Sequence, residues 1–183
     1  MKKNIFIFII AIMLLSLVLA DAVLISQVYY DPLQEAGSEA IELYNPSNKS
    51  INVTGYVIKT SSSDKDAVLK GTVPSYGFFL AADSGWSEKR DNLSWAKADY
   101  EESITLGNKD SGIAILNNNT VIDAVGWGSS DIRTGAPAIN IKEGKSLLRV
   151  SYTNNNSRDF IESSPRFRSK NSTLITRQNS FNN

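Results

Sequence analysis

Short apolar runs separated by turn residues make up most of the sequence after residue 22. Residues 39–45 have the clearest pattern, because Ile41 and Leu43 fall on one face of a strand and Glu42 and Tyr44 on the other. The Asn-Pro-Ser-Asn sequence that follows is a turn signal. Further strands are expected at residues 23–30, 51–60, 67–73, 78–82, 103–106 and 144–150.

The clearest local prediction is a β-hairpin. Residues 112–116 and 120–127 are two apolar runs separated by Asn117, Asn118 and Asn119, and asparagine tolerates the positive φ that tight hairpin turns need. Residues 83–102 are polar and acidic and are expected to form a long connection. Eight or nine short strands with frequent turn signals predict an all-β protein, either a β-sandwich or a barrel.

The first 22 residues differ from the rest of the chain. Two lysines precede an apolar stretch of about 15 residues, and small residues follow it, which is typical of a secretory signal peptide cleaved after Ala20 or Ala22. The alternative is an uncleaved membrane anchor, although the stretch is shorter than the roughly 20 residues of a usual span. The expected location is therefore secreted or on the cell surface, with membrane contact only through this segment.

Composition narrows the possible chemistry. The chain has no cysteine and no histidine, which excludes disulfides, thiolate nucleophiles, Ser-His-Asp triads and the HExxH zinc motif. The net charge is zero, but residues 21–162 are acidic overall while residues 163–183 carry only basic charges. An acidic body is not typical of a dedicated nucleic-acid-binding domain.

Several motifs in order resemble the lamin-tail domain family. They are VLISQVYYDP with GSEAIELYNPSNKSINVTGYVI near the start, TVPSYGFFLAAD at residues 72–83, GNKDSGIAILNNNTVIDAVGWG at residues 107–128, and GKSLLRVSYTNNNSRDFIESSPRFRSKN at residues 144–171. Two positions depart from the family pattern. Gln27 replaces a common acidic residue, and Arg166-Phe167-Arg168 stands where the family usually closes with Pro-Gly.

The resemblance implies an immunoglobulin-like β-sandwich over residues 23–171, followed by a flexible tail at residues 172–183. It also implies an interaction module and not an enzyme. In nuclear lamins the domain contacts proteins and DNA, exported prokaryotic relatives carry it alone or beside hydrolase and surface domains, and the domain itself is not known as an enzyme. No cofactor is expected. Protein or surface glycan is the expected partner, on fold-level analogy.

Candidate binding residues come from the second strand. Glu42 is expected to point outward beside Tyr44, where the pair would bind a cation or a partner molecule. The alternative is a structural glutamate that caps backbone amides or pairs with a lysine across the sheet, a pair that contributes about 0.2–1 kcal/mol. The structural role is the favoured one.

The acidic residues offer weaker alternatives. Asp64 with Asp66, or Asp31 with Glu35 and Glu39, would supply oxygen ligands for calcium, but neither set has the spacing of a calcium-binding loop. No metal site is therefore expected. A carboxylate-based hydrolase without histidine needs two carboxylates across one cleft, and no sequence feature marks such a pair.

Two further features concern the surface. Arg166, Arg168 and Lys170 form a basic C-terminal segment that would attract nucleic acid or another anionic polymer, or would pair with the acidic body instead. In addition, Asn-x-Ser/Thr sequons are candidate glycosylation sites in an exported protein. They are Asn48, Asn52, Asn92, Asn118, Asn155 and Asn171.

Overall fold

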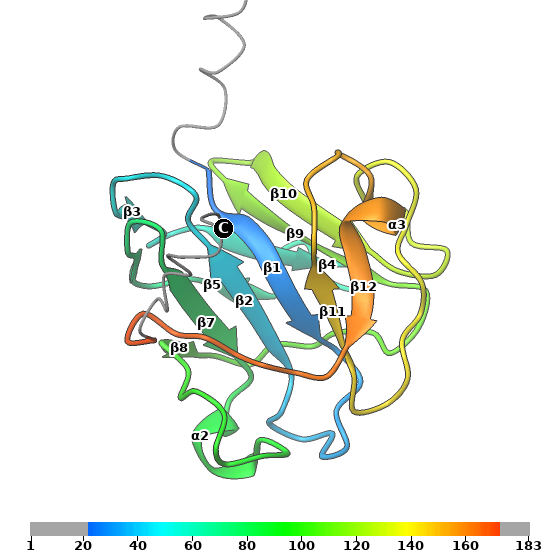
Figure 1. The fold of residues 1–183 in the computed structure, drawn as a ribbon, viewed down its shortest axis with the longest axis horizontal. Coiled ribbons are helices and arrows are strands. Elements are labelled where there is room, and N and C mark those ends of the chain that lie inside the picture. Colours follow the sequence, from blue (N-terminus) through cyan, green and yellow to red (C-terminus); the bar gives the residue numbers. More distant parts are fainter. Residues whose placement is uncertain (1–21, 173–183) are drawn as a thin grey trace, which may run out of the picture.

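The computed structural model describes residues 22–172. The expectations for the signal segment and for residues 173–183 of the tail therefore lie outside the described residues. Within the described range the chain forms three sheets (Figure 1), with strand orders β12-β11-β1-β2-β7-β8, β10-β9-β4-β5 and β3-β6. The strands are β1 (Leu24–Tyr29), β2 (Ala40–Tyr44), β3 (Ile51–Asn52), β4 (Val57–Thr60), β5 (Ala67–Val68), β6 (Thr72–Val73), β7 (Phe78–Ala82), β8 (Tyr100–Glu101), β9 (Gly112–Asn117), β10 (Thr120–Gly126), β11 (Ser146–Arg149) and β12 (Phe160–Ser163), and the helices are α2 (Trp86–Lys89) and α3 (Asn156–Asp159).

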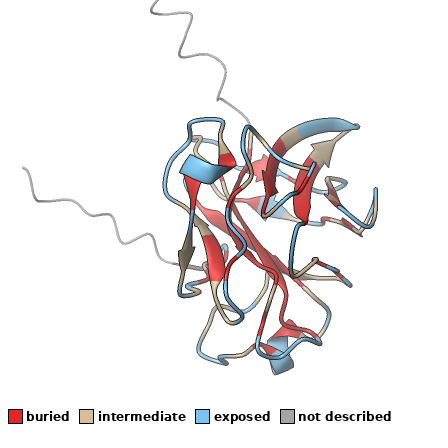
Figure 2. Ribbon diagram, turned by 90° about the vertical axis from the view of Figure 1, so that its right-hand side faces the viewer, coloured by how far each residue is buried: buried red, intermediate tan, exposed pale blue. Residues whose placement is uncertain are grey.

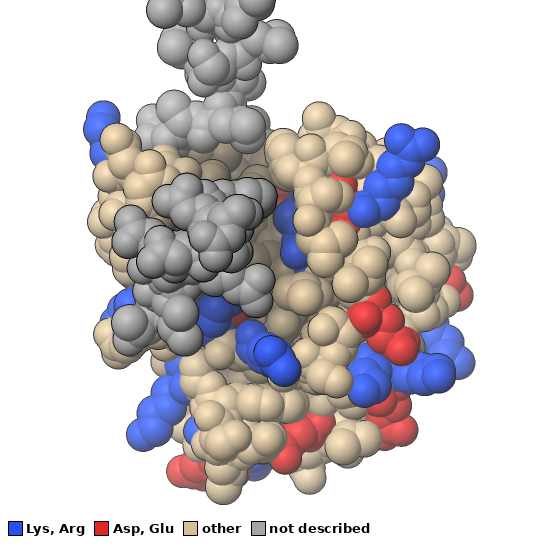
Figure 3. Space-filling view, in the orientation of Figure 1, with Lys and Arg blue, Asp and Glu red and all other residues tan. Residues whose placement is uncertain are grey.

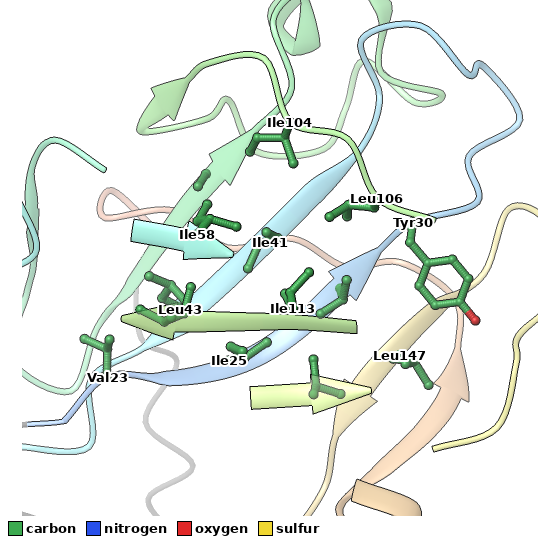
Figure 4. Close-up of a cluster of buried hydrophobic side chains, with 14 of the residues drawn as sticks. Val23, Ile25, Tyr30, Ile41, Leu43, Ile58, Ile104, Leu106, Ile113 and Leu147 are labelled. Atoms are coloured by element: carbon green, nitrogen blue, oxygen red, sulfur yellow. The ribbon is translucent and has the colours of Figure 1, made fainter. Parts of the chain in front are cut away.

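The two larger sheets pack face to face and bury a common core between them (Figure 2). Ile41 and Leu43 of β2 point into this core, as the alternating pattern predicts, and meet Ile58 and Ile113 from the four-stranded sheet (Figure 4). The all-β sandwich prediction is confirmed. The predicted hairpin is also confirmed, with Asn118 and Asn119 at φ 47° and 64° in a two-residue turn.

Several strand predictions are wrong in detail. The range described here contains twelve strands and not eight or nine, since residues 51–60 and 67–73 each divide into two short strands. The long connection at residues 83–102 contains α2 and β8, and the last strand is β12, not the one at residues 144–150. Two-residue strands are too short to show a period, which explains why the pattern missed these divisions.

The predicted strand at residues 103–106 is absent, because carboxylates take the place of a neighbouring strand. The amides of Ile104, Thr105 and Leu106 donate in turn to Asp83 (3.2 Å), Asp66 (2.9 Å) and Glu39 (2.9 Å). Ile104 and Leu106 still point into the core.

Glu39 makes this arrangement sensitive to pH. Burial raises the pKa of Glu39 to about 8 from an ordinary value of 4.5, and the nearby carboxylates of Asp83, Glu35 and Asp66 add to the rise. The folded state therefore holds the proton more tightly than the unfolded state. The stability contributed by protonated Glu39 is complete below pH 4.5 and is lost as the pH rises through about 8.

We expect the thermal midpoint to fall as the pH rises through this window, and to fall less in Glu39→Gln. Glutamine keeps an acceptor for the Leu106 amide but does not titrate. Calorimetry across the pH range measures the two slopes, and equal slopes would rule out the role given to Glu39.

A β-bulge in β1 decides which of its side chains reach the core. The register with β2 shifts between Ile25 and Gln27, so that Val28 and Tyr30 join Ile25 in the core while Gln27 and Tyr29 turn to the opposite face. Without the bulge, strict alternation from Ile25 would have placed the Gln27 side chain in the core between the two sheets. The bulge therefore gives the outer face of the six-stranded sheet a polar amide that the period of two does not predict.

A charged network holds the bulge against the other sheet. Asp123 of β10 accepts the Ile25 amide at 2.7 Å, and Arg149 of β11 donates from Nε to the Ile25 carbonyl oxygen at 2.7 Å. The two side chains also pair with each other at 2.6 Å, and Asp159 lies 3.6 Å from the same guanidinium. Burial raises the pKa of Asp123, while Arg149 lowers it. The sequence pattern gave no sign of this network.

The Glu-Leu-Tyr-Asn-Pro run ends in a structural corner. Asn45 is fully buried, and its Nδ2 donates to the carbonyl oxygens of Lys49, Val73 and Pro74, while its Oδ1 accepts the Ser47 amide. One asparagine side chain thus joins the turn after β2 to the turn before β7. The predicted turn is present, and Asn45 accounts for its geometry.

Candidate binding groove on the outer sheet face

The C-terminal segment, residues 164–172, crosses the outer face of the six-stranded sheet, where it runs in front of β1 and β2 in Figure 1. Phe167 packs into an aromatic layer with Trp86 and Trp95, at ring-centroid distances of 5.1 and 5.3 Å. Tyr29 of β1 lies 5.5 Å from Trp95 in the same layer. Both faces of the central strands are therefore covered.

Glu42 lies beneath this segment. Its side chain is 0% exposed, and its oxygens accept the Ser26 hydroxyl at 2.6 Å, the Arg168 amide at 2.6 Å and the Arg168 Nη2 at 2.6 Å. The Arg168 guanidinium also lies 3.6 Å from the centre of the Phe78 ring. The expected outward accessibility of Glu42 is wrong, because the C-terminal segment covers it. The geometry agrees with the structural role, with an arginine from a distant segment in place of a cross-strand lysine.

The other basic residues of the segment differ from Arg168. Lys170 donates its backbone amide to Asp99 at 2.9 Å, and its side chain is exposed. Arg166 is exposed as well, and no acidic side chain among residues 22–172 forms an ion pair with it. Of the three predicted cations, Arg168 is therefore neutralised within the fold, while Arg166 and Lys170 face outward.

A groove of about 1080 Å³ opens beside the C-terminal segment. Strands β1, β2, β7, β11 and β12 contribute to it, together with Tyr76, the C-terminal segment and residues 94–96. Figure 3 views the molecule from this side, and basic side chains lie around the hollow in the middle of the face. No acidic residue of the described chain lines the groove. The lining residues that matter most are Gln27, Tyr44, Tyr76, Phe78, Arg166 and Arg168.

Gln27 is the polar group inside the groove. It is 0% exposed, and its Nε2 has no hydrogen-bond partner within the described range, while its Oε1 accepts the Arg166 amide at 3.4 Å. An unmet buried donor costs about 1–3 kcal/mol, so its presence calls for an explanation.

Tyr76 lines the groove and is 49% exposed. Its φ of 50° lies in the left-handed region, which costs a residue with a large side chain about 1–3 kcal/mol and is concentrated at functional sites. The sequence pattern gave no sign of this exposed aromatic residue.

The two departures from the family pattern meet in this groove, since Gln27 and Arg166 contact each other there. The contact joins the Gln27 side chain to the backbone amide of Arg166, and the Arg166 guanidinium has no acidic partner among residues 22–172. Tyr44, Arg166 and Arg168, which the sequence had offered as binding candidates, also line the groove, but only the fold showed that these positions are neighbours.

A second hollow, of about 420 Å³, is lined by serines and by Asp64, Asp110 and Asp131. Lys59 holds the pKa of Asp64 below its ordinary value, and hydrogen bonds from Ser129 and Asn140 do the same for Asp110. A general acid of a glycosidase needs the opposite shift. This hollow therefore gives no support to the hydrolase alternative.

The remaining candidates are dispersed. Five of the sequon asparagines are exposed, and Asn155 is half-buried because its side chain caps α3 by accepting the Ser157 amide. Between residues 22 and 172, no three acidic side chains come close enough together to hold a metal ion. Over the same residues, no helix has the length and apolar character needed to cross a membrane.

The two packed sheets form a β-sandwich, and the lamin tail domain is a family with an immunoglobulin-like β-sandwich fold. The family model of the lamin tail domain matches residues 20–129, and the chain belongs to this family. Domains of this family are in general non-catalytic. The match ends before β11 and β12, although these strands complete the same sheet as β1. No curated protein matches the chain.

Proposed function

We infer that this protein is an exported, non-catalytic binding module of the cell surface. The observation that carries the proposal is the groove on the outer sheet face, which combines an unpaired arginine, an unmet buried amide and exposed aromatic surface without any acidic lining residue. Ligand sites combine apolar walls with a few convergent polar groups in this way. The N-terminal sequence, with its basic, apolar and small-residue regions, supports export.

The proposal is tested by sedimentation of the protein with envelope fragments of the cells that produce it. The wild type is expected to pellet with the fragments, and the double variant Arg166→Gln/Tyr76→Ser is expected to bind at least tenfold more weakly, as loss of a charged hydrogen bond predicts. Arg158→Gln is the matched control, because Arg158 is an exposed arginine outside the groove. Equal binding of the double variant and the wild type would contradict the proposal.

Nucleic acid is the less favoured partner. Arg168 is already paired with Glu42, so the basic segment presents only Arg166 and Lys170 to an anionic polymer. Two free charges give a weak attraction that salt removes easily. If the protein is retained on DNA at physiological salt, and deletion of residues 163–183 abolishes that retention in a chain that remains folded, the nucleic-acid function is the better one.

A further inference from the structure

The charges of the groove point to a ligand that places one anionic group in it. Three arginines line it, but Arg168 is paired with Glu42 and Arg149 with Asp123. Arg166 is therefore the one lining cation of the described chain without an acidic partner. A ligand that places one carboxylate in the groove matches a single free guanidinium, because a carboxylate can accept two parallel hydrogen bonds from arginine.

The unmet donor of Gln27 requires an acceptor from outside the described chain. Its Nε2 is buried in the groove wall close to Arg166, whose amide contacts the Oε1 of the same side chain. A ligand oxygen placed between Arg166 and Gln27 would satisfy both groups. A carboxylate has the lone pairs to accept from the two donors at once.

The aromatic and hydroxyl groups of the groove suit a sugar ring. Tyr44 and Tyr76 offer ring faces beside the polar lining, and tyrosine combines apolar surface with a hydrogen-bonding end. Further hydroxyl groups come from five serines spread around the groove. They are Ser26, Ser94, Ser163, Ser164 and Ser172.

The sheet itself argues against an extended peptide. The floor of the groove is a sheet face, and β1 is paired on both sides, with β2 and with β11. A peptide that adds a strand needs a free edge, and of the strands that line the groove only β12, which contributes Ser163, has one. Over β1, β2, β7 and β11 a ligand meets side chains and not a free strand edge, which suits a polysaccharide.

Overall charge argues against an occupant that is held through many phosphate contacts, as nucleic acid is. Residues 22–172 contain 18 Asp and Glu against 16 Lys and Arg, a net charge of −2. Residues 173–183 of this chain are also a poor electrostatic match for the basic groove, although Ser172, which precedes them, lies in the groove wall. The one charged side chain in residues 173–183 is Arg177, which is basic like the groove.

We propose that the groove binds a carboxylated polysaccharide, with the sugar carboxylate held between Arg166 and Gln27 and a ring packed against Tyr76. The proposal rests on the binding function inferred above and names its ligand class. It can fail independently of that function. If envelope binding depends on Arg166 but no acidic glycan binds, the proposed binding function is retained and the proposed ligand class is wrong.

The test is calorimetric titration of the protein, expressed from its complete sequence, with oligogalacturonate and with the same oligosaccharide as its methyl ester. The ester keeps the sugar and removes the charge. The wild type is expected to bind the acid at least tenfold more tightly than the ester. Arg166→Gln is expected to abolish this preference, and Arg158→Gln to keep it.

Gln27→Met separates a binding role from a structural one. Removal of the unmet donor is expected to raise the thermal midpoint by about 2–4 °C while it weakens binding of the acidic glycan about fivefold. A residue that serves the fold alone would lose stability on this change.

Three outcomes would overturn the proposal. They are equal affinity for acid and ester, tighter binding of oligoglutamate or single-stranded DNA than of oligogalacturonate, and absence of binding both by the full chain and by a chain that stops after Ser172. Binding by the shortened chain alone also supports the ligand class.

Discussion

Replacement of Asp123 by Ala is expected to lower the free energy of unfolding by about 3–5 kcal/mol, the usual cost of breaking a buried ion pair from one side. Asp123 and Arg149 have side chains that are 6% and 9% exposed. Without the carboxylate, the Ile25 amide loses its 2.7 Å acceptor, and Arg149 keeps only the more distant Asp159. The measurement is urea unfolding at neutral pH.

Asp123→Asn is the matched control. The amide oxygen can still accept the Ile25 amide, but it cannot neutralise Arg149, so this variant is expected to lose clearly less stability than Asp123→Ala. A loss below about 1 kcal/mol in Asp123→Ala would place the site among ordinary surface pairs and would contradict its role in closing the two sheets.

Phe167→Ala is expected to cost about 3–5 kcal/mol, the range for removal of a phenyl ring from a core. Phe167 is 7% exposed and contacts Trp86, Trp95 and Tyr29 at ring distances between 5.1 and 5.8 Å. The same change is expected to alter tryptophan fluorescence of the folded protein, because two tryptophans lose a neighbouring ring. Urea unfolding followed by fluorescence reports both effects.

Two variants make this result specific. Phe167→Leu retains most of the apolar volume and is expected to lose about 1.5 kcal/mol or less. Ile161→Ala removes a side chain of β12 that is 48% exposed and is expected to stay within about 0.5 kcal/mol of the wild type. If Phe167→Ala behaves like Ile161→Ala, the C-terminal segment does not hold the outer layer together.

The sandwich and its hairpin were predictable because they depend on local rules. Alternation over residues 39–45 places Ile41 and Leu43 in the core, and three consecutive asparagines supply the left-handed turn between β9 and β10. Both signals lie within a few residues of the structure that they specify.

The groove was not predictable, because the contacts that form it join positions far apart in the chain. Arg168 reaches Glu42 across 126 residues, and Arg166 reaches Gln27 across 139. The β1 bulge also moves Gln27 to the outer face against the simple alternation of a strand. The basic segment was recognised as a feature, but which of its charges stay free depends on these distant partners.

The order of the strands affects how this chain acquires its fold. β1 is the first strand in sequence, yet one of its two neighbours is β11, which begins at Ser146. Tyr30 accepts the Ile141 amide, and Glu42 is covered only once Arg168 is in place. The sheet therefore stays open until almost the whole chain has been synthesised, and such distant pairings make closure slow. For a protein that is threaded through a narrow channel, as the proposed export requires, late closure keeps the chain extended until passage is complete.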